Sequence, residues 1–277
     1  MAPRVIERRG AGGLGPRVAS ALVMAPAAIG LAYLGGVAFG LFIAALAVLM
    51  AQEWQEFSRE GESGAPLARA AFVAAATIPV LFAVAGRIEI ALASILPALA
   101  TAALAARIGR ARSSWWALGV VYIALPCIAI VWLRAAPGHG RETIFWLFTV
   151  VWATDIGAYA AGRLIGGPRL APRISPNKTW AGLAGGVIAA AAAGTVLALL
   201  FGMPVSPPLA LFAGLLGLVS QAGDLWESMI KRRFGKKDSG SLIPGHGGVL
   251  DRLDGMMAAA PALALVVLAL DGGGVRW

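Results

Sequence analysis

The chain has 277 residues, of which 59% are apolar and only 13% charged, and its mean hydropathy is +0.78. Soluble domains are about half apolar and a quarter charged, so this composition excludes an ordinary soluble protein and indicates an integral membrane protein. The net charge of +9 would suit nucleic acid, but membrane proteins also collect Lys and Arg in cytoplasmic loops, so we expect no nucleic-acid partner. The single cysteine, Cys127, cannot form an internal disulfide.

Residues 1–17 are basic and rich in Gly and Pro, and we expect them to form a disordered tail. Apolar segments of roughly 17–25 residues, the length that crosses a bilayer as a helix, then follow for almost the whole chain. The predicted fold class is therefore all-α, a polytopic membrane protein with about nine transmembrane helices. The first apolar run continues into a second span, so no cleavable signal peptide is expected. The expected spans are residues 18–34, 36–51, 70–86, 88–106, 115–133, 143–162, 182–202, 208–226 and 255–270.

Two regions follow the tail. Residues 18–142 hold about five of the spans, and residues 143–277 hold about four, together with polar loops at 163–180 and 228–254. If the N-terminus is cytoplasmic, nineteen of the 23 Lys and Arg residues fall in cytoplasmic segments, which is the positive-inside pattern. Both polar loops then lie on the cytoplasmic face, where we expect the active site.

Residues 223–254, called the charged segment below, hold five carboxylates and six Lys or Arg side chains between apolar spans. If the preceding helix continues past Trp226, the side chains of one face come together at i, i+3, i+4 and i+7. A carboxylate pair, a hydroxyl and an ammonium would then line one wall, from Asp224, Glu227, Ser228 and Lys231.

The rest of the charged segment has the residues for a phosphate-binding loop and for a metal site. The run KKDSGSLIPGHGG is too rich in Gly to continue a helix, and its backbone N–H groups can form a concave phosphate site. Asp251 and Asp254 lie three residues apart at the start of the last span, where they either complement the positive helix end or bind a metal. With Asp224 and Glu227 nearby, a Mg²⁺ site becomes the favoured interpretation, because Mg²⁺ takes oxygen ligands and bridges to phosphates.

Polar residues elsewhere receive simpler interpretations. Asp155 lies about 10 Å inside its span at 1.5 Å per residue, a depth at which an acid costs about 2.5–3.5 kcal/mol, so a functional role is favoured over packing. The pair Glu53 and Glu56 is expected to be a solvated helix end. Tryptophans at span edges are expected at the membrane interface; these are Trp54, Trp115, Trp116 and Trp180. Small residues at 182, 185 and 186 predict close helix packing.

Three blocks of the sequence resemble one enzyme family. The charged segment carries the pattern Ser228-x-Ile230-Lys231-Arg232, then Lys237-Asp238-x-Gly240, then Ile243-Pro244-x-His246-Gly247-Gly248-Val249-x-Asp251-Arg252-Leu253-Asp254. The other two blocks are Asp155-x-x-Ala158-Tyr159-x-x-Gly162-Arg163 and Ser175-Pro176-Asn177-Lys178-Thr179-Trp180. Together they resemble the phosphatidate cytidylyltransferase, or CDP-diacylglycerol synthase, family. The chain departs from the family at Ala181, where Glu is usual, and residues 1–110 match mainly in hydropathy.

The resemblance implies an enzyme that joins CTP and phosphatidic acid into CDP-diacylglycerol and pyrophosphate, in the inner membrane of a bacterium. It implies Mg²⁺ or Mn²⁺ as cofactor and leaves a second, monovalent cation and a homodimer open. The expected metal ligands are Asp224, Asp251, Asp254 and Glu227, and the expected catalytic residues are Asp224, Asp251, Lys231, Arg252 and Asp155. The expected substrate-binding residues are Ser175, Asn177, Lys178, Ser228, Arg232, Lys237, Asp238, His246, Gly247 and Gly248, with a loop-shaping role for His246 equally open.

Three rival functions are weaker. A CDP-alcohol phosphotransferase also places aspartates in a membrane, but its DGx2AR core is not found in this sequence. A polyprenol kinase would use CTP as phosphoryl donor and release CDP in place of pyrophosphate. A transporter would carry buried charge along several spans, whereas the only acid expected well inside a span is Asp155. No Walker, GxSxG or HExxH motif indicates another chemistry.

Overall fold

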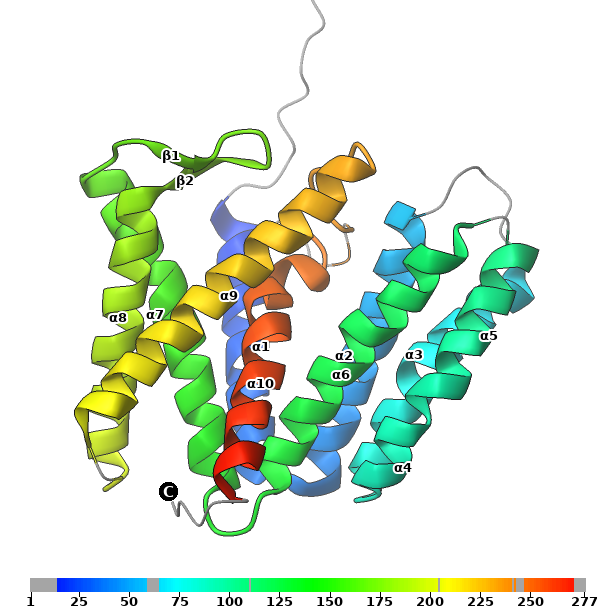
Figure 1. The fold of residues 1–277 in the computed structure, drawn as a ribbon, viewed down its shortest axis with the longest axis horizontal. Coiled ribbons are helices and arrows are strands. Elements are labelled where there is room, and N and C mark those ends of the chain that lie inside the picture. Colours follow the sequence, from blue (N-terminus) through cyan, green and yellow to red (C-terminus); the bar gives the residue numbers. More distant parts are fainter. Residues whose placement is uncertain are drawn as a thin grey trace, which may run out of the picture.

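The computed structural model describes residues 14–58, 65–109, 111–203, 205–240, 242 and 247–271. In this part of the chain, ten helices and one two-stranded sheet form (Figure 1). The N-terminal elements are α1 (Leu14–Leu34), α2 (Gly36–Ser58), α3 (Pro66–Val84), α4 (Ile88–Ala93), α5 (Ile95–Ile108) and α6 (Ser113–Ala135). The C-terminal elements are α7 (Gly140–Leu164), β1 (Arg169–Ala171), β2 (Ser175–Thr179), α8 (Trp180–Leu200), α9 (Pro207–Arg233) and α10 (Leu250–Asp271).

The predicted all-α membrane fold is confirmed. Among the described residues, eight helical segments are long and apolar enough to cross a membrane, and Leu22–Leu34 of α1 forms a shorter apolar helix. Every expected span coincides with a helix, but the fourth is broken at Ser94 into α4 and α5. The helix of the charged segment continues past Trp226, the condition on which the shared face of Asp224, Glu227 and Lys231 depended, since α9 ends at Arg233. The small sheet was not predicted. The expected tail lies outside the described residues except for its last four, which form the start of α1 and are not disordered as expected.

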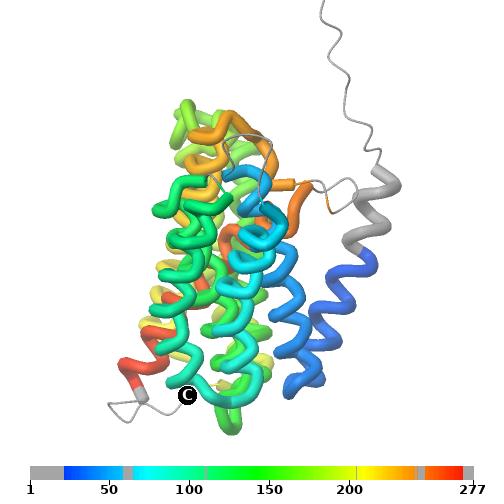
Figure 2. Tube along the Cα trace, turned by 90° about the vertical axis from the view of Figure 1, so that its right-hand side faces the viewer, coloured from blue at the N-terminus to red at the C-terminus, as the bar shows by residue number. Residues whose placement is uncertain are grey.

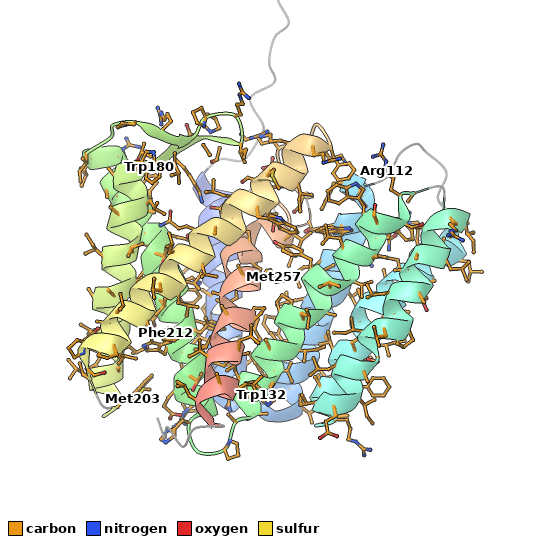
Figure 3. The ribbon with its side chains drawn as sticks, viewed as in Figure 1. Arg112, Trp132, Trp180, Met203, Phe212 and Met257 are labelled. Carbon is orange, nitrogen blue, oxygen red and sulfur yellow. The ribbon has the colours of Figure 1, made fainter. Side chains whose placement is uncertain are left out.

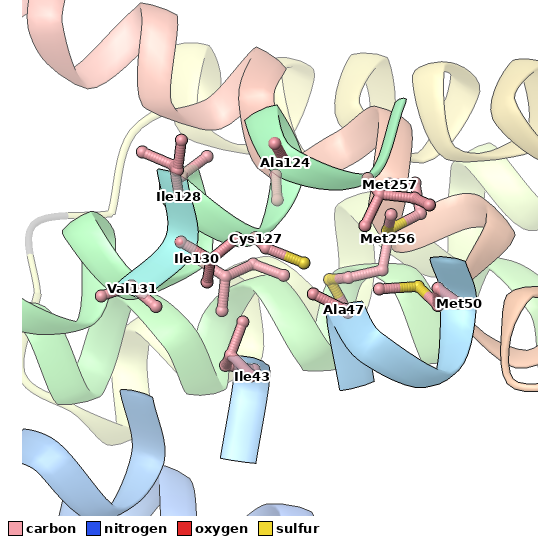
Figure 4. Close-up of a cluster of buried hydrophobic side chains, with 14 of the residues drawn as sticks. Ile43, Ala47, Met50, Ala124, Cys127, Ile128, Ile130, Val131, Met256 and Met257 are labelled. Carbon is pink, nitrogen blue, oxygen red and sulfur yellow. The ribbon is translucent and has the colours of Figure 1, made fainter. Parts of the chain in front are cut away.

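The helices form two groups joined by α10. Helices α2, α3, α5 and α6 pack together on one side, and α7, α8 and α9 pack on the other (Figure 1). Helix α10 contacts α6, α7 and α9. Figure 4 shows the apolar centre of this contact, where Ile43, Met50, Cys127 and Met257 are buried together. This packing places the start of α10 between the two groups.

Helix α1 lies at the outside of the bundle, beside α2 (Figure 2). Arg134 of α6 holds its C-terminal end, because the guanidinium donates to the carbonyl oxygens of Ala32 at 2.6 Å and Tyr33 at 2.9 Å. These are carbonyls that a helix end leaves without partners. The guanidinium occupies the space that a side chain at Gly35, with φ +67°, would fill. Arg134 is therefore a structural cation at the opposite end of the molecule from the polar loops.

Helices α7 and α8 pack closely through small residues, as the sequence predicted. A Cβ atom at Gly182 would lie 2.9 Å from the carbonyl oxygen of Ala158, and one at Gly186 would lie 2.9 Å from that of Thr154. Only glycine permits this approach of the two backbones. The strand β2 leads directly into α8, and the Thr179 hydroxyl caps it by accepting from the N–H of Gly182 at 3.0 Å.

The polar loops gather at one end of the bundle. Figure 1 shows the β1–β2 hairpin, the C-terminal ends of α2 and α9 and the start of α10 at that end. Trp180 and Arg112 lie at the same end, and Met203 lies at the opposite end (Figure 3). The interpretation of the tryptophans was wrong for two of them: Trp54 and Trp116 are buried in the core. Trp54 satisfies its indole N–H there, since it donates to the carbonyl oxygen of Trp115 at 3.0 Å.

Candidate active site

Two glycines bring the acids of the charged segment together. Where α9 crosses α10, a Cβ atom at Gly223 would lie 2.9 Å from the carbonyl oxygen of Asp254. A Cβ atom at Gly255 would clash with the hydroxyl of Ser220. The backbones therefore touch at these glycines, and the residues next to them, Asp224 and Asp254, lie close enough to interact electrostatically. The sequence placed these acids near one another, and the helix crossing explains how.

The predicted substrate loop meets the charged segment directly. Lys178 of β2 forms a salt bridge with Asp224 of α9, with its ammonium 2.6 Å from Oδ2. The other oxygen, Oδ1, accepts from the Ser228 hydroxyl one turn later at 3.3 Å. Both partners of the salt bridge stay partly accessible, with side-chain exposures of 21% for Lys178 and 29% for Asp224. A substrate can therefore reach this pair from outside.

Asp155 and Arg252 complete an accessible cluster around Asp224. Asp155 is exposed on α7 and interacts electrostatically with Asp224, Lys178 and Arg252. The exposed Arg252 belongs to the first turn of α10, and Asp254 follows just beyond that turn. We call Asp155, Lys178, Asp224, Arg252 and Asp254 the acidic cluster. It unites residues from four elements, α7, β2, α9 and α10, and combines three carboxylates with two cations.

The remaining predicted substrate residues surround this cluster at the same end. Arg232 donates to the carbonyl oxygen of Ile174 at 3.3 Å, which connects the end of α9 to the hairpin. Asn177 is exposed on β2, and its carbonyl oxygen accepts from Arg169. Lys237 and Asp238 are exposed after α9, and Ser175 is half-buried at the start of β2. His246 lies outside the described residues.

Lys231 lies in a second, buried group of charges. Its ammonium is 3.1 Å from a Glu227 oxygen and 2.6 Å from an Asp251 oxygen. The side-chain exposures of the three are 8%, 1% and 5%. The second oxygen of Glu227 accepts from the Tyr122 hydroxyl of α6 at 2.8 Å. These contacts connect α6, α9 and α10. The Lys231 ammonium binds two carboxylates of the chain itself.

Asp251 uses both of its oxygens on the loop between α9 and α10. Oδ2 accepts from the backbone N–H of Gly248 at 2.8 Å and of Ser239 at 2.9 Å, while Oδ1 accepts from Lys231. The sequence left two interpretations open for this residue, a metal ligand or a complement to the helix start. The described contacts are those of a residue that complements the helix start, because the carboxylate accepts from backbone N–H groups around the first turn of α10.

The interpretation of Glu53 as a solvated helix end was wrong. Its residue exposure is 1%, whereas Glu56, the other member of the pair, is exposed. The Glu53 carboxylate accepts from the N–H groups of Val249 at 2.7 Å and Leu250 at 2.9 Å. It also accepts from the Ser239 hydroxyl at 3.2 Å. An acid of α2 thus caps the N-terminus of α10, almost two hundred residues away in the chain.

These contacts correct the expected phosphate cradle. The N–H groups of Ser239, Gly248, Val249 and Leu250 donate to Asp251 and Glu53, so in the described residues these donors already bind anions of the chain itself. A Cβ atom at Gly248 would clash with the Ser239 hydroxyl and lie 2.6 Å from a Glu53 oxygen. Gly248 is therefore required for the shape of the loop, and its N–H does not face a substrate.

The acidic cluster fits a divalent cation that shares its ligands with phosphate. Among the described residues, no group of three or more His, Cys, Asp or Glu side chains is arranged to hold a metal ion without further ligands. Mg²⁺ does not need one, because it commonly takes one or two carboxylates and completes its shell with water and substrate phosphates. Asp224, which is partly exposed, and Asp254, which is half-buried, are two carboxylates that interact with each other. Glu227 and Asp251 fit this role less well, since their side chains are almost fully buried and both are held by Lys231.

Glu53, Tyr122 and Ser239 are the polar residues of the site that sequence reasoning missed. Tyr122 had a usable signal, because a hydroxyl in the middle of an apolar span needs a partner. Glu53 follows a long apolar run within the same helix, which also suggests an internal partner. Neither pattern identifies the hydrogen-bond partner, because the partners belong to distant elements: Glu227 of α9 for Tyr122, and the start of α10 for Glu53.

Comparison with known proteins agrees with the geometry. A phosphatidate cytidylyltransferase of Brucella suis is 41% identical over 249 residues, covering 90% of this chain and 91% of that protein. One from Pseudomonas aeruginosa is 38% identical over 270 residues, covering 93% and 98%. One from Bacillus subtilis is 40% identical over 147 residues, covering 53% and 55%. The model of the cytidylyltransferase family matches residues 15–270, and this chain therefore belongs to the cytidylyltransferase family.

Proposed function

We propose that the chain is a phosphatidate cytidylyltransferase, which joins CTP and phosphatidic acid into CDP-diacylglycerol and pyrophosphate. The relatives with this name cover the chain almost end to end. One observation carries the proposal from the residues themselves: the Lys178–Asp224 salt bridge, which joins the SPNKTW block to the charged segment beside Asp155. All three blocks of the family pattern thus meet in one accessible cluster.

The reaction is limited by charge repulsion more than by nucleophile strength. A phosphate monoester has a second pKa near ~6, so the attacking oxygen of phosphatidate is already anionic at neutral pH. Two unit charges 4 Å apart repel by about 4 kcal/mol at an effective dielectric constant near 20, and several such pairs meet when two phosphates approach. The site must therefore neutralise charge and orient the reactants, which is the general strategy of phosphoryl and nucleotidyl transfer.

The accessible cations supply part of this neutralisation. In the proposed complex, Lys178 exchanges Asp224 for a substrate phosphate, and Arg252 and Arg232 contact the triphosphate and the departing pyrophosphate. Asn177 and Ser175 lie on the same hairpin as Lys178 and contact the lipid phosphate. Lys237 and Asp238 border the nucleotide from the loop that follows α9. His246, from the same loop, keeps the two roles that the sequence left open, and Gly247 keeps its expected backbone contact with phosphate.

The proposed metal is Mg²⁺ or Mn²⁺, bound by Asp224 and Asp254 with Asp155 beside them. It would supply a positive charge that bridges phosphate oxygens and lowers the repulsion between the reactants. Three carboxylates face only two cations in the acidic cluster, and this surplus of negative charge favours a further cation. A second, monovalent cation and a homodimer stay open in the proposal.

The proposed location is the inner membrane of a bacterium, with the N-terminus and the acidic cluster on the cytoplasmic side. Multiple apolar helices and bacterial relatives support a multi-pass membrane protein. The N-terminal tail and the loops on the same side together hold nineteen of the 23 Lys and Arg residues, which supports the orientation through the positive-inside rule. CTP is a cytoplasmic substrate, which agrees with this orientation.

The position of a radiolabel tests the proposed reaction. Purified protein is incubated with phosphatidic acid, Mg²⁺ and CTP that carries ³²P on either the α or the γ phosphorus. Cytidylyl transfer places the α label in the lipid product and the γ label in pyrophosphate. A γ label in the lipid together with free CDP would show a kinase instead. Absence of any labelled lipid with either nucleotide would reject both reactions.

A further inference from the structure

The carboxylate of Glu53 holds both ends of the loop between α9 and α10. On the side of α9, it accepts from the Ser239 hydroxyl at 3.2 Å. On the side of α10, it accepts from the backbone N–H groups of Val249 and Leu250 at 2.7 and 2.9 Å. All three donors are buried together with the carboxylate. Glu53 therefore fixes the loop at two points separated by ten residues of chain.

The loop is shaped around this side chain. A Cβ atom at Gly240 would lie 3.0 Å from the Glu53 Cγ, and one at Gly248 would lie 2.6 Å from its Oε2. Glycines at both positions let the backbone approach the carboxylate closely. Lys236 adds a further contact to the same helix, since its ammonium donates to the carbonyl oxygen of Glu56 at 2.8 Å. The end of α2 is thus the surface against which the loop is ordered.

The cap acts on the turn of α10 that carries site residues. Leu250 begins α10, and Arg252 and Asp254 follow within its first turn or just beyond. A carboxylate at a helix N-terminus binds the free N–H groups and interacts favourably with the helix dipole. The geometry of Arg252 and Asp254 relative to Asp224 therefore depends on a residue of the N-terminal half, outside the three blocks of the family pattern.

We propose that Glu53 is a positioning residue for cytidylyl transfer, which orders the loop between α9 and α10 and orients the first turn of α10. The inference rests on the proposed function, because Arg252 and Asp254 are assigned to the substrates there. Glu53 touches no substrate. It acts by presenting oxygen acceptors to three donors, which an amide of the same size cannot do, since its NH₂ group would face a donor.

The test compares Glu53→Gln with Gln55→Leu, a matched control on the same helix. Gln55 is also buried and also makes a hydrogen bond to backbone, but its partner is the carbonyl oxygen of Arg69 in α3, away from the loop. Both variants lose buried hydrogen bonds. We expect only Glu53→Gln to lower kcat per folded molecule, by about 10- to 100-fold, because a displacement near 1 Å can cost that much. The KM for CTP and for phosphatidic acid should change less than kcat.

Hydrogen exchange measured by mass spectrometry supplies a second result that needs no activity. In Glu53→Gln one of the amides of Val249 and Leu250 faces an NH₂ group in place of its acceptor, so we expect peptides covering residues 247–252 to exchange at least about tenfold faster. Gln55→Leu should leave these peptides unchanged. If Glu53→Gln does not fold, Ser239→Ala removes only one of the three donors and should give a smaller change in both kcat and exchange.

Two outcomes would overturn the proposal. Wild-type kcat per folded molecule in Glu53→Gln, with faster exchange at 247–252, would show that the cap has no part in catalysis. Equal losses of kcat in Glu53→Gln and Gln55→Leu would show a general loss of stability. Failure of the wild-type protein to make CDP-diacylglycerol would instead reject the proposed function, and the exchange comparison would still report whether Glu53 orders the loop.

Discussion

Replacement of Lys231 by Met should strongly destabilise the protein. The substitution keeps most of the apolar stem and removes the ammonium that lies 3.1 Å from Glu227 and 2.6 Å from Asp251. Both carboxylates are at least 95% buried as side chains, so each loses its cation without gaining water. Breaking a buried pair by removing one partner typically costs about 3–5 kcal/mol.

Other contacts moderate this loss. Asp251 keeps the N–H groups of Ser239 and Gly248, and Glu227 keeps the Tyr122 hydroxyl. We therefore expect a loss near the lower limit, about 3 kcal/mol, which is a large part of a total stability of about 5–15 kcal/mol. Equilibrium unfolding of the purified protein in detergent micelles measures the free energy of unfolding.

A double variant separates charge from packing. Glu227→Gln removes one of the two uncompensated charges and keeps an acceptor for Tyr122, so adding it to Lys231→Met should recover about 1–2 kcal/mol. A change of less than about 0.5 kcal/mol in Lys231→Met, within the range of ordinary surface substitutions, would refute the buried network. Loss of kcat in that case would return Lys231 to the substrate-facing role expected from the sequence.

Three further predictions concern the site. Asp224→Asn should lower kcat by at least about 100-fold and change stability by less than about 1 kcal/mol, because its partly exposed pair with Lys178 contributes little to folding. Asp251→Asn, in contrast, should lower the free energy of unfolding by about 3 kcal/mol in the same assay. Equal stability of the two variants would contradict the distinction between an accessible Asp224 and a buried, structural Asp251. Lys178→Ala should chiefly raise the KM of the substrates in initial-rate assays, and unchanged values for both would count against it. Gly248→Ala should destabilise by about 1–3 kcal/mol, whereas Gly30→Ala, a helical position with no atom within 4 Å of the added methyl group, should be neutral or stabilising.

The outline of the fold could be predicted because it depends on local properties. Apolar length and the loops between apolar runs locate most helix ends to within a few residues, whereas α2 and α9 continue about two turns past the expected spans. The continuation of α9 brings its i, i+4 pairs together. The charge count predicted that the two polar loops lie on one face, and the Lys178–Asp224 salt bridge, which was not itself predicted, joins the hairpin to α9 there. In each case the signal lies in the spacing along the chain or in the requirement that charge avoids lipid.

The features that the sequence analysis did not predict depend on contacts between residues far apart in the chain. Glu53 and Leu250 are 197 residues apart, and a carboxylate near a helix end looks the same in sequence whether it faces water or another helix. Trp54 likewise suits either the interface or a core that offers its N–H a carbonyl. The hairpin of β1 and β2 has no alternating apolar pattern, because SPNKT is mostly polar. Tertiary contacts determine the environments of Glu53 and Trp54 and the formation of the hairpin, and the local sequence pattern carries no information about those contacts.

Binding of Mn²⁺ in place of Mg²⁺ tests the proposed division between the accessible cluster and the buried network most directly. Free Mn²⁺ gives a sharp paramagnetic resonance signal that diminishes on binding, so a titration with protein and CTP, corrected by the same titration with CTP alone, counts the ions that the protein binds. We expect Asp224→Asn and Asp254→Asn to weaken binding by at least about tenfold, as loss of a charged ligand should. Gln55→Leu, the structural control, should bind as the wild type does. Wild-type binding in both aspartate variants would contradict the assignment of the acidic cluster as the metal and nucleotide site.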